Sequence, residues 1–326
     1  MWKRAVSHSL LSKLNEEDAV YRKIIVGYDG SDQGRDGLAL GRMLAKATGA
    51  TLLVANVFRH DVPLAPGWPK NEEATRAGAE KVLSDAASML EDVEVETRAI
   101  GSSSAAWGLQ DLAEAEGADL IALGSSHRGG IGRVLIGTVS DRLFHGAPCA
   151  VAVAPHGSCD RTDAALRVIG VAFDGSPESK AALAEAARLG EAAAATLRIF
   201  AVAESDIFFG YSAMPSADDQ AELFRSQKEH LEREIAKALE GLPRELRAAG
   251  EVLSGEAADT IASKAEEGID LLVMGSRGYG PARRVLLGSV SSKLARSAPC
   301  PLLVVPRTAE RFERAGRAAV AVGGAD

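Results

Sequence analysis

The chain has 326 residues, of which 46% are hydrophobic and 25% charged, a balance typical of a globular protein with about two domains. Its formal net charge of -8 argues against a nucleic-acid-binding protein, because neutralising phosphates requires a basic surface. Three cysteines are too few for a disulfide framework, and no apolar segment reaches the length of a signal peptide or a membrane span. These features predict a cytoplasmic protein that binds neither nucleic acid nor membrane.

Alternating strands and helices begin after an N-terminal extension, residues 1–20, whose leucines have helical spacing. The first strand starts at Lys23 and ends before the turn Asp29-Gly30-Ser31, whose serine can cap the next helix. Gly49 is expected to end that helix. The further strands expected in a first domain, residues 21–155, are 51–57, 93–99, 119–123 and 149–153, and its further helices include 72–90 and 107–116.

The same pattern starts again after a polar linker, residues 156–164. Asp29 and Asp174 each end a strand in a similar Asp-Gly-Ser turn and are 145 positions apart. Three further pairs are each 151 positions apart, namely Gly124 and Gly275, Gly137 and Gly288, and Pro148 and Pro299. This constant offset predicts an internal repeat, with a second domain at 165–306 and a tail at 307–326.

Each half is therefore predicted to be an α/β domain with five strands. Strands such as 271–274 are apolar at every position, which indicates a parallel sheet covered by helices on both faces. In such Rossmann-like folds, ligands bind outside the carboxyl ends of the strands. The last strands, 149–153 and 300–305, are apolar and would aggregate if left as open edges. We therefore expect the two domains to pair within one chain, packed face to face.

A glycine-rich loop in the second half points to a ligand. Gly275 ends a strand, Gly278 follows after two residues, and Gly288-Ser289 follows after nine more and opens a helix. Glycine backbones allow phosphate oxygens to approach, and a helix N-terminus attracts anions. This spacing resembles the nucleotide loop of the universal stress protein family, and the chain is similar to a tandem member of that family. The resemblance implies two adenine-nucleotide α-hydrolase-like domains.

The resemblance further implies that the second domain binds ATP, with AMP and ADP as alternatives. Asp174 would contact the adenosine or a magnesium ion that accompanies ATP, although an aspartate here also forms the turn before Ser176. Val202 would face the adenine. The other nucleotide-binding residues that it implies are Gly275, Arg277, Gly278, Gly288, Ser289 and Val290.

The first domain departs from this pattern at one position. The corresponding residues are Asp29, Val57, Gly124, His127, Gly137, Thr138 and Val139. His127 stands where the second domain has Gly278, and a side chain there obstructs close backbone contact with a phosphate. We therefore expect the first site to bind nucleotide more weakly than the second.

The role implied by the resemblance is a stress-response or signalling module. The six histidines have no spacing suited to a metal cluster, and no nucleophile stands beside a base, so any ATP hydrolysis should be slow and incidental. Two alternatives stay open: an ATP-consuming enzyme, such as a slow ATPase or adenylyl transferase of a related fold, and a ligand-free interaction scaffold. Pairing of two chains into a homodimer is also left open.

Overall fold

The computed structural model describes residues 19–59, 72–126, 132–160, 165–204, 216–276 and 287–306. The N-terminal extension, apart from residues 19 and 20, and the whole tail lie outside this part of the chain. Three of the predicted site residues also lie outside it, namely His127, Arg277 and Gly278.

The first half alternates strands and helices as its sequence predicts. Its elements are β1 (Lys23–Gly27), α2 (Asp32–Thr48), β2 (Thr51–Arg59), α3 (Glu72–Ser88), β3 (Val95–Ser102), α4 (Ala105–Glu116), β4 (Leu120–Gly124), α5 (Thr138–Phe144) and β5 (Ala150–Ala154). Ser31 caps α2 by accepting a hydrogen bond from the backbone N–H of Gly34, and Gly49 ends the helix with a left-handed φ of 73°. Both local signals in the sequence are therefore confirmed.

The second half repeats this order after a 3-10 turn, η1 (Ser158–Asp160). Its elements are β6 (Val168–Ala172), α6 (Pro177–Ala193), β7 (Thr196–Ala203), α7 (Ala217–Glu240), β8 (Ala248–Ser254), α8 (Ala257–Ala265), β9 (Leu271–Gly275), α9 (Ser289–Ser297) and β10 (Leu302–Val305). Each of the two halves contains a five-stranded parallel sheet, as predicted.

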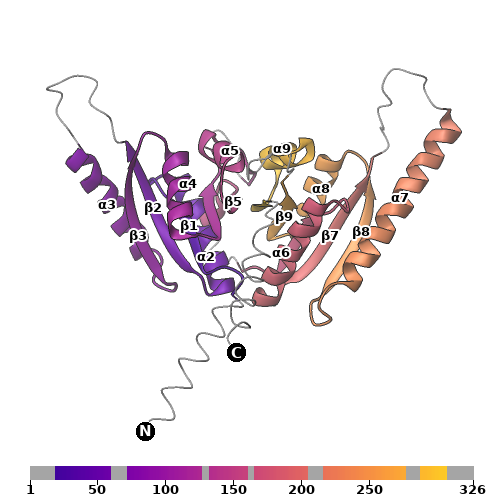
Figure 1. Ribbon diagram of the computed structural model, residues 1–326, viewed down its shortest axis with the longest axis horizontal. Coiled ribbons are helices and arrows are strands. Elements are labelled where there is room, and N and C mark those ends of the chain that lie inside the picture. Colours follow the sequence, from indigo (N-terminus) through magenta and orange to yellow (C-terminus); the bar gives the residue numbers. More distant parts are fainter. Residues whose placement is uncertain are drawn as a thin grey trace, which may run out of the picture.

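The two sheets join edge to edge into one ten-stranded sheet, in the order β3-β2-β1-β4-β5-β10-β9-β6-β7-β8 (Figure 1). The join is an antiparallel pairing of β5 with β10, which places Leu303 opposite Ala152. The expectation that the domains pack face to face is therefore wrong, because the last strands hydrogen-bond to each other through their edges. This pairing removes the two apolar edges that the sequence would otherwise leave open.

Helices cover both faces of this continuous sheet. Buried side chains of α2, α3, α6 and α7 pack on one face, and those of α4, α5, α8 and α9 pack on the other. Both cores run across the join, since Ala152 and Leu303 belong to the core on one face, and Val151 and Leu302 to the core on the other. The carboxyl ends of β1, β2 and β4 consequently lie together at one edge of the first half, and those of β6, β7 and β9 at the corresponding edge of the second.

One carboxylate in each half holds the start of the first strand in place. Asp119 accepts hydrogen bonds from the backbone N–H groups of Arg22 (2.7 Å) and Lys23 (3.2 Å). Asp270 does the same for Arg167 (2.9 Å) and Val168 (2.8 Å). These contacts fix the register between the first and fourth strands of each half, on which the geometry of the carboxyl edge depends.

Candidate functional site

The topology brings the predicted residues of the first half to one edge. In β1 and β2, Gly27 pairs with Ala55, so Val57 stands beyond the end of β1, near the level of Asp29. Gly124 ends β4 on the other side of β1. Gly137 begins α5, and Ser126, just after β4, is its closest neighbour outside its own turn. Asp29, Val57, Gly124 and Gly137 therefore come from four separate segments and share this edge.

The second half repeats the arrangement. Ala172 of β6 pairs with Phe200 of β7, which places Val202 beyond the end of β6, near Asp174. The hydroxyl of Ser291, in the first turn of α9, donates to the carbonyl oxygen of Gly275 at 3.3 Å. The N-terminus of α9, with Gly288 and Ser289, is thereby held against the end of β9.

The Asp-Gly-Ser turns are built alike in the two halves. Asp29 and Asp174 each accept the backbone N–H of the serine two residues later, both at 3.0 Å. The intervening glycines have left-handed φ values of 85° and 78°, which favour glycine. Ser176 then caps α6, with Pro177 in its first turn, so the turn-forming role considered for Asp174 is present.

The residue Asp174 is exposed at the edge of the sheet, although neighbouring atoms partly surround its carboxylate. Partial burial raises the pKa of Asp174, but hydrogen bonds from Ser176 and Ser179 outweigh it, so the net pKa is lower than usual. The group is therefore ionised at neutral pH. An ionised carboxylate at this edge can accept hydrogen bonds from a ribose or coordinate a cation.

The glycines that end β4 and β9 have a packing explanation. A Cβ on Gly124 would lie 1.7 Å from the carbonyl oxygen of Gln33 in α2, and one on Gly275 would lie 2.5 Å from that of Glu178 in α6. Both distances are far inside van der Waals contact. These glycines allow a helix to pack directly on a strand, whatever ligand the site takes.

Backbone conformation does not require glycine at the positions that begin α5 and α9. Gly137 (φ −87°, ψ 175°) and Gly288 (φ −76°, ψ 178°) are extended, a conformation open to any residue. A Cβ on Gly137 would meet its nearest neighbour, Ser126, only at 3.4 Å. Within the described part of the chain, no side chain caps either helix, so their first N–H groups stay available to an anion.

The remaining predicted residues surround these helix starts. Thr138 and Ser289 are exposed at the first helical positions, and Val139 and Val290 follow them, half-buried. Val57 and Val202 are also half-buried and pack on the same face of the sheet as α5 and α9. Hydroxyls and N–H groups thus line the helix starts, with an apolar side chain at the end of each second strand.

Sequence reasoning missed the contacts that hold the stretch before α5. Ser125 accepts the backbone N–H of Leu135 at 2.6 Å, and Ser126 donates its own to the Leu135 carbonyl at 2.8 Å. His156 bonds Gly132 and Arg133 through its backbone, at 2.9 and 3.4 Å. Backbone pairing between distant segments leaves no pattern in residue types, so no signal in the sequence pointed to it.

The segment predicted as a linker is anchored to the first half. The carboxylate of Asp36, buried in α2, accepts the backbone N–H groups of Gly157 (3.0 Å) and Cys159 (2.8 Å). Its Oδ2 lies 3.6 Å from Nδ1 of His156. Residues 156–160 therefore lie against α2 in a fixed conformation.

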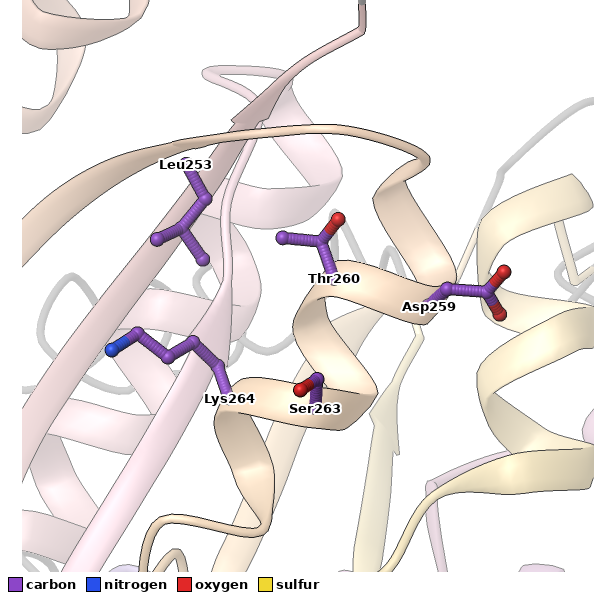
Figure 2. Close-up of a pocket in the computed structure, with 5 residues that line it drawn as sticks. All are labelled: Leu253, Asp259, Thr260, Ser263 and Lys264. Carbon is purple, nitrogen blue, oxygen red and sulfur yellow. The ribbon is translucent and has the colours of Figure 1, made fainter.

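A concavity of about 390 Å³ lies between the end of β8 and α8, and its lining residue Leu253 pairs with Val202 at the carboxyl edge. Figure 2 shows the side chain of Asp259 pointing away from those of Leu253 and Lys264. Lys264 is already engaged by Glu267 at 2.9 Å. Because its charged groups diverge, this concavity offers no convergent set of ligand groups.

Two kinds of feature are absent from the residues that the structure describes. None of their helices is long and apolar enough to cross a membrane. They also contain no cluster of three or more histidine, cysteine, aspartate or glutamate side chains that could hold a metal ion.

Known proteins match the chain over most of its length. The model of the universal stress protein family matches residues 20–155 and again 165–306. Two universal stress proteins of Mycobacterium tuberculosis are similar: one is 28% identical over 295 residues (86% of this chain, 96% of the relative), the other 25% identical over 293 (87% and 99%). A crystal structure of a universal stress protein from Archaeoglobus fulgidus, 21% identical, covers 88% of this chain and 98% of its own with a TM-score of 0.62, which confirms the fold. Because the family model matches both halves, the chain belongs to the universal stress protein family.

Proposed function

We propose that the chain binds an adenine nucleotide, ATP foremost, at the carboxyl edge of its second half and acts as a stress-response or signalling module in the cytoplasm. The observation that carries this proposal is the start of α9: an extended glycine, Gly288, leaves the first N–H groups of the helix available beside Gly275. Family membership supports the same role.

The groups at this edge suit the parts of a nucleotide. The N–H groups of Ser289 and Val290 and the Ser289 hydroxyl would hold the phosphates, because a helix N-terminus carries partial positive charge. Arg277 and Gly278, outside the described residues, would complete the phosphate loop. Asp174 would accept hydrogen bonds from the ribose or hold a magnesium ion accompanying ATP, and Val202 would contact the adenine. The first half would offer Asp29, Val57, Gly137, Thr138 and Val139, with weaker affinity because of His127.

Titration calorimetry with ATP on two matched variants tests this proposal. Valine fits the extended backbone at both Gly288 and Gly137, so Gly288→Val and Gly137→Val should fold alike. We expect Gly288→Val to abolish most of the binding, because its side chain blocks the helix N-terminus, and Gly137→Val to change it little. The opposite ranking would make the first half the principal site.

Turnover distinguishes the alternative functions. We expect the chain to consume nucleotide, if at all, far more slowly than the turnover rates of roughly 1 to 10³ s⁻¹ that are typical of enzymes. A hydrolysis or adenylyl-transfer rate in that range would replace the binding proposal with an enzymatic one. If ATP, ADP and AMP all fail to bind, an interaction scaffold becomes the better explanation.

We further propose that residues 21–155 and 165–306 act as one intrachain pair joined through β5 and β10. The buried side chains along both strands support this, since β5 and β10 are buried at every position. Small-angle scattering should show a single particle with the maximum dimension of the joined sheet. Two separated domains in the scattering profile would contradict the pairing.

A further inference from the structure

The four residues Gly132 to Leu135, here called the bridge, contact three separate parts of the molecule just before the first site. Leu135 is bonded to Ser125 and Ser126 at the end of β4. Gly132 and Arg133 are bonded to His156, which follows β5. The third set of contacts reaches into the second half. Leu135 lies two residues before Gly137, so a displacement of any of these partners would shift the backbone next to the first site.

The contacts with the second half are made at the end of α9. Val134, fully buried, donates its backbone N–H to the carbonyl oxygen of Ala298 at 2.8 Å. The Arg133 guanidinium donates to the carbonyl oxygen of Ser297 at 3.2 Å and to Glu266 at 3.0 Å. Ser297 is the last residue of α9, and Glu266 directly follows α8. A cation at the end of a helix also complements its dipole.

One helix therefore links the second candidate site to the segment that precedes the first. Its N-terminus, at Gly288, is the proposed phosphate site of the second half, and its C-terminal end holds the bridge of the first. Helix α9 is nine residues long and packed on the sheet through Leu294 and Ala295. A short, packed helix moves as a unit, so fixing one of its ends restrains the other.

We propose that the two sites are coupled through α9, so that nucleotide bound in the second half raises the affinity of the first. This rests on the proposed function. Phosphates at Gly288 restrain α9, and α9 restrains Arg133 and Val134 through Ser297 and Ala298. The first site then loses less conformational entropy when it binds nucleotide, and this gives positive cooperativity. By reciprocity, nucleotide in the first half strengthens binding in the second by the same factor.

Calorimetry measures this coupling with variants that isolate each site. Gly137→Val gives the binding constant of the second site alone, and Gly288→Val that of the first. We expect the product of the two constants in the unmodified chain to exceed the product of these isolated constants about fivefold. Adding Arg133→Ala should lower this ratio towards one, because it removes the contacts with Ser297 and Glu266 and leaves only the bond from Val134 to Ala298. Adding Arg98→Ala should leave it unchanged, since Arg98 is equally exposed and pairs with Glu116 within the first half.

Hydrogen exchange gives a second measurement that needs no binding at the first site. In the Gly137→Val chain, ATP should slow exchange in peptides that contain the Val134 amide, although only the second site can fill. A ratio of one together with unchanged exchange would overturn the coupling, and a ratio insensitive to Arg133→Ala would overturn the part of its route that Arg133 provides. Absence of ATP binding in the unmodified chain is a separate result: it would overturn the proposed function, and the coupling with it.

Discussion

The two halves share their backbone construction and differ in what surrounds it. In both, an aspartate fixes the start of the first strand, a glycine lets a helix pack on the fourth strand, and an extended glycine begins the helix before the last strand. These features are required by the fold or supply N–H groups to a ligand, and they recur with the repeat. They mark the edge of each half at which we propose that nucleotide binds.

The side chains around the two turns are not alike. Gly30 faces Val82 of α3, whereas Gly175 faces Glu234 of α7, which pairs with Lys180 and Lys237. Asp36 anchors residues 156–160, whereas the matching position in α6 is Ala181. The repeat therefore preserves the backbone of the site, while the side-chain contacts around it differ between the halves.

The largest effect is expected from the glycine that both halves require. Gly124→Ala should lower the free energy of unfolding by about 3 kcal/mol, because its Cβ would overlap the carbonyl oxygen of Gln33 at 1.7 Å. Gly275→Ala should act in the same direction, with its Cβ 2.5 Å from the carbonyl oxygen of Glu178. Chemical denaturation measures both changes.

Gly78→Ala is the matched control for these substitutions. Gly78 lies in α3, and none of the described heavy atoms outside its own helix and its chain neighbours comes within 4 Å of a Cβ there. Alanine at this position should stabilise the chain by about 0.5 to 1 kcal/mol. If Gly124→Ala proved as harmless, the close packing of α2 on β4 would not be what the glycine provides.

A smaller loss is expected from the anchor found in the first half alone. Asp36→Ala leaves the N–H groups of Gly157 and Cys159 without their acceptor, which should cost about 2 kcal/mol of unfolding free energy. Asp32→Ala, one turn earlier, removes an exposed carboxylate paired with Arg35 and should cost less than about 1 kcal/mol. Calorimetric melting of the two variants compares them, and equal shifts in Tm would show that residues 156–160 need no anchor.

The smallest effect is expected from the carboxylate of Glu234, which lies beside Gly175 in the Asp-Gly-Ser turn of the second half. Hydrogen bonds from Lys237 and Lys180 lower the pKa of Glu234 to about 2, from 4.5. A carboxyl whose pKa is lower in the folded state stabilises the fold above its unfolded pKa and loses that contribution as pH falls through the folded value. The Tm difference between the unmodified chain and Glu234→Gln should therefore be constant above about pH 5.5 and shrink between pH 4.5 and 2. A difference that did not vary with pH would exclude an ionic origin.

Local signals in the sequence predicted most of the fold correctly. Ser31 and Ser176 cap the helices expected of them, Gly49 ends α2, and Gly288 begins α9. Strand ends were less accurate: β3, expected at 93–99, runs from Val95 to Ser102. Its side chains lie largely at the exposed edge of the sheet, so hydrophobic periodicity marks its ends poorly.

The relation between the halves could not be predicted from the same signals. Apolar last strands indicated that β5 and β10 would be covered, but hydrogen bonding through edges and packing through faces both satisfy that requirement. Asp36 and the bridge were missed for a similar reason. A carboxylate that binds N–H groups more than a hundred residues away looks like any polar position of a helix until the chain is folded.

The antiparallel seam of β5 and β10 also has a kinetic meaning. In a dimer of separate subunits such a seam forms by a second-order reaction, so its occupancy falls on dilution. Here the two strands belong to one chain and meet at an effective concentration on the millimolar scale that short tethers provide. If the halves pair within one chain as proposed, the pairing does not depend on the expression level. In one chain, a residue of the first half such as His127 can differ from its counterpart in the second half. A covalently joined pair can therefore carry two unequal sites.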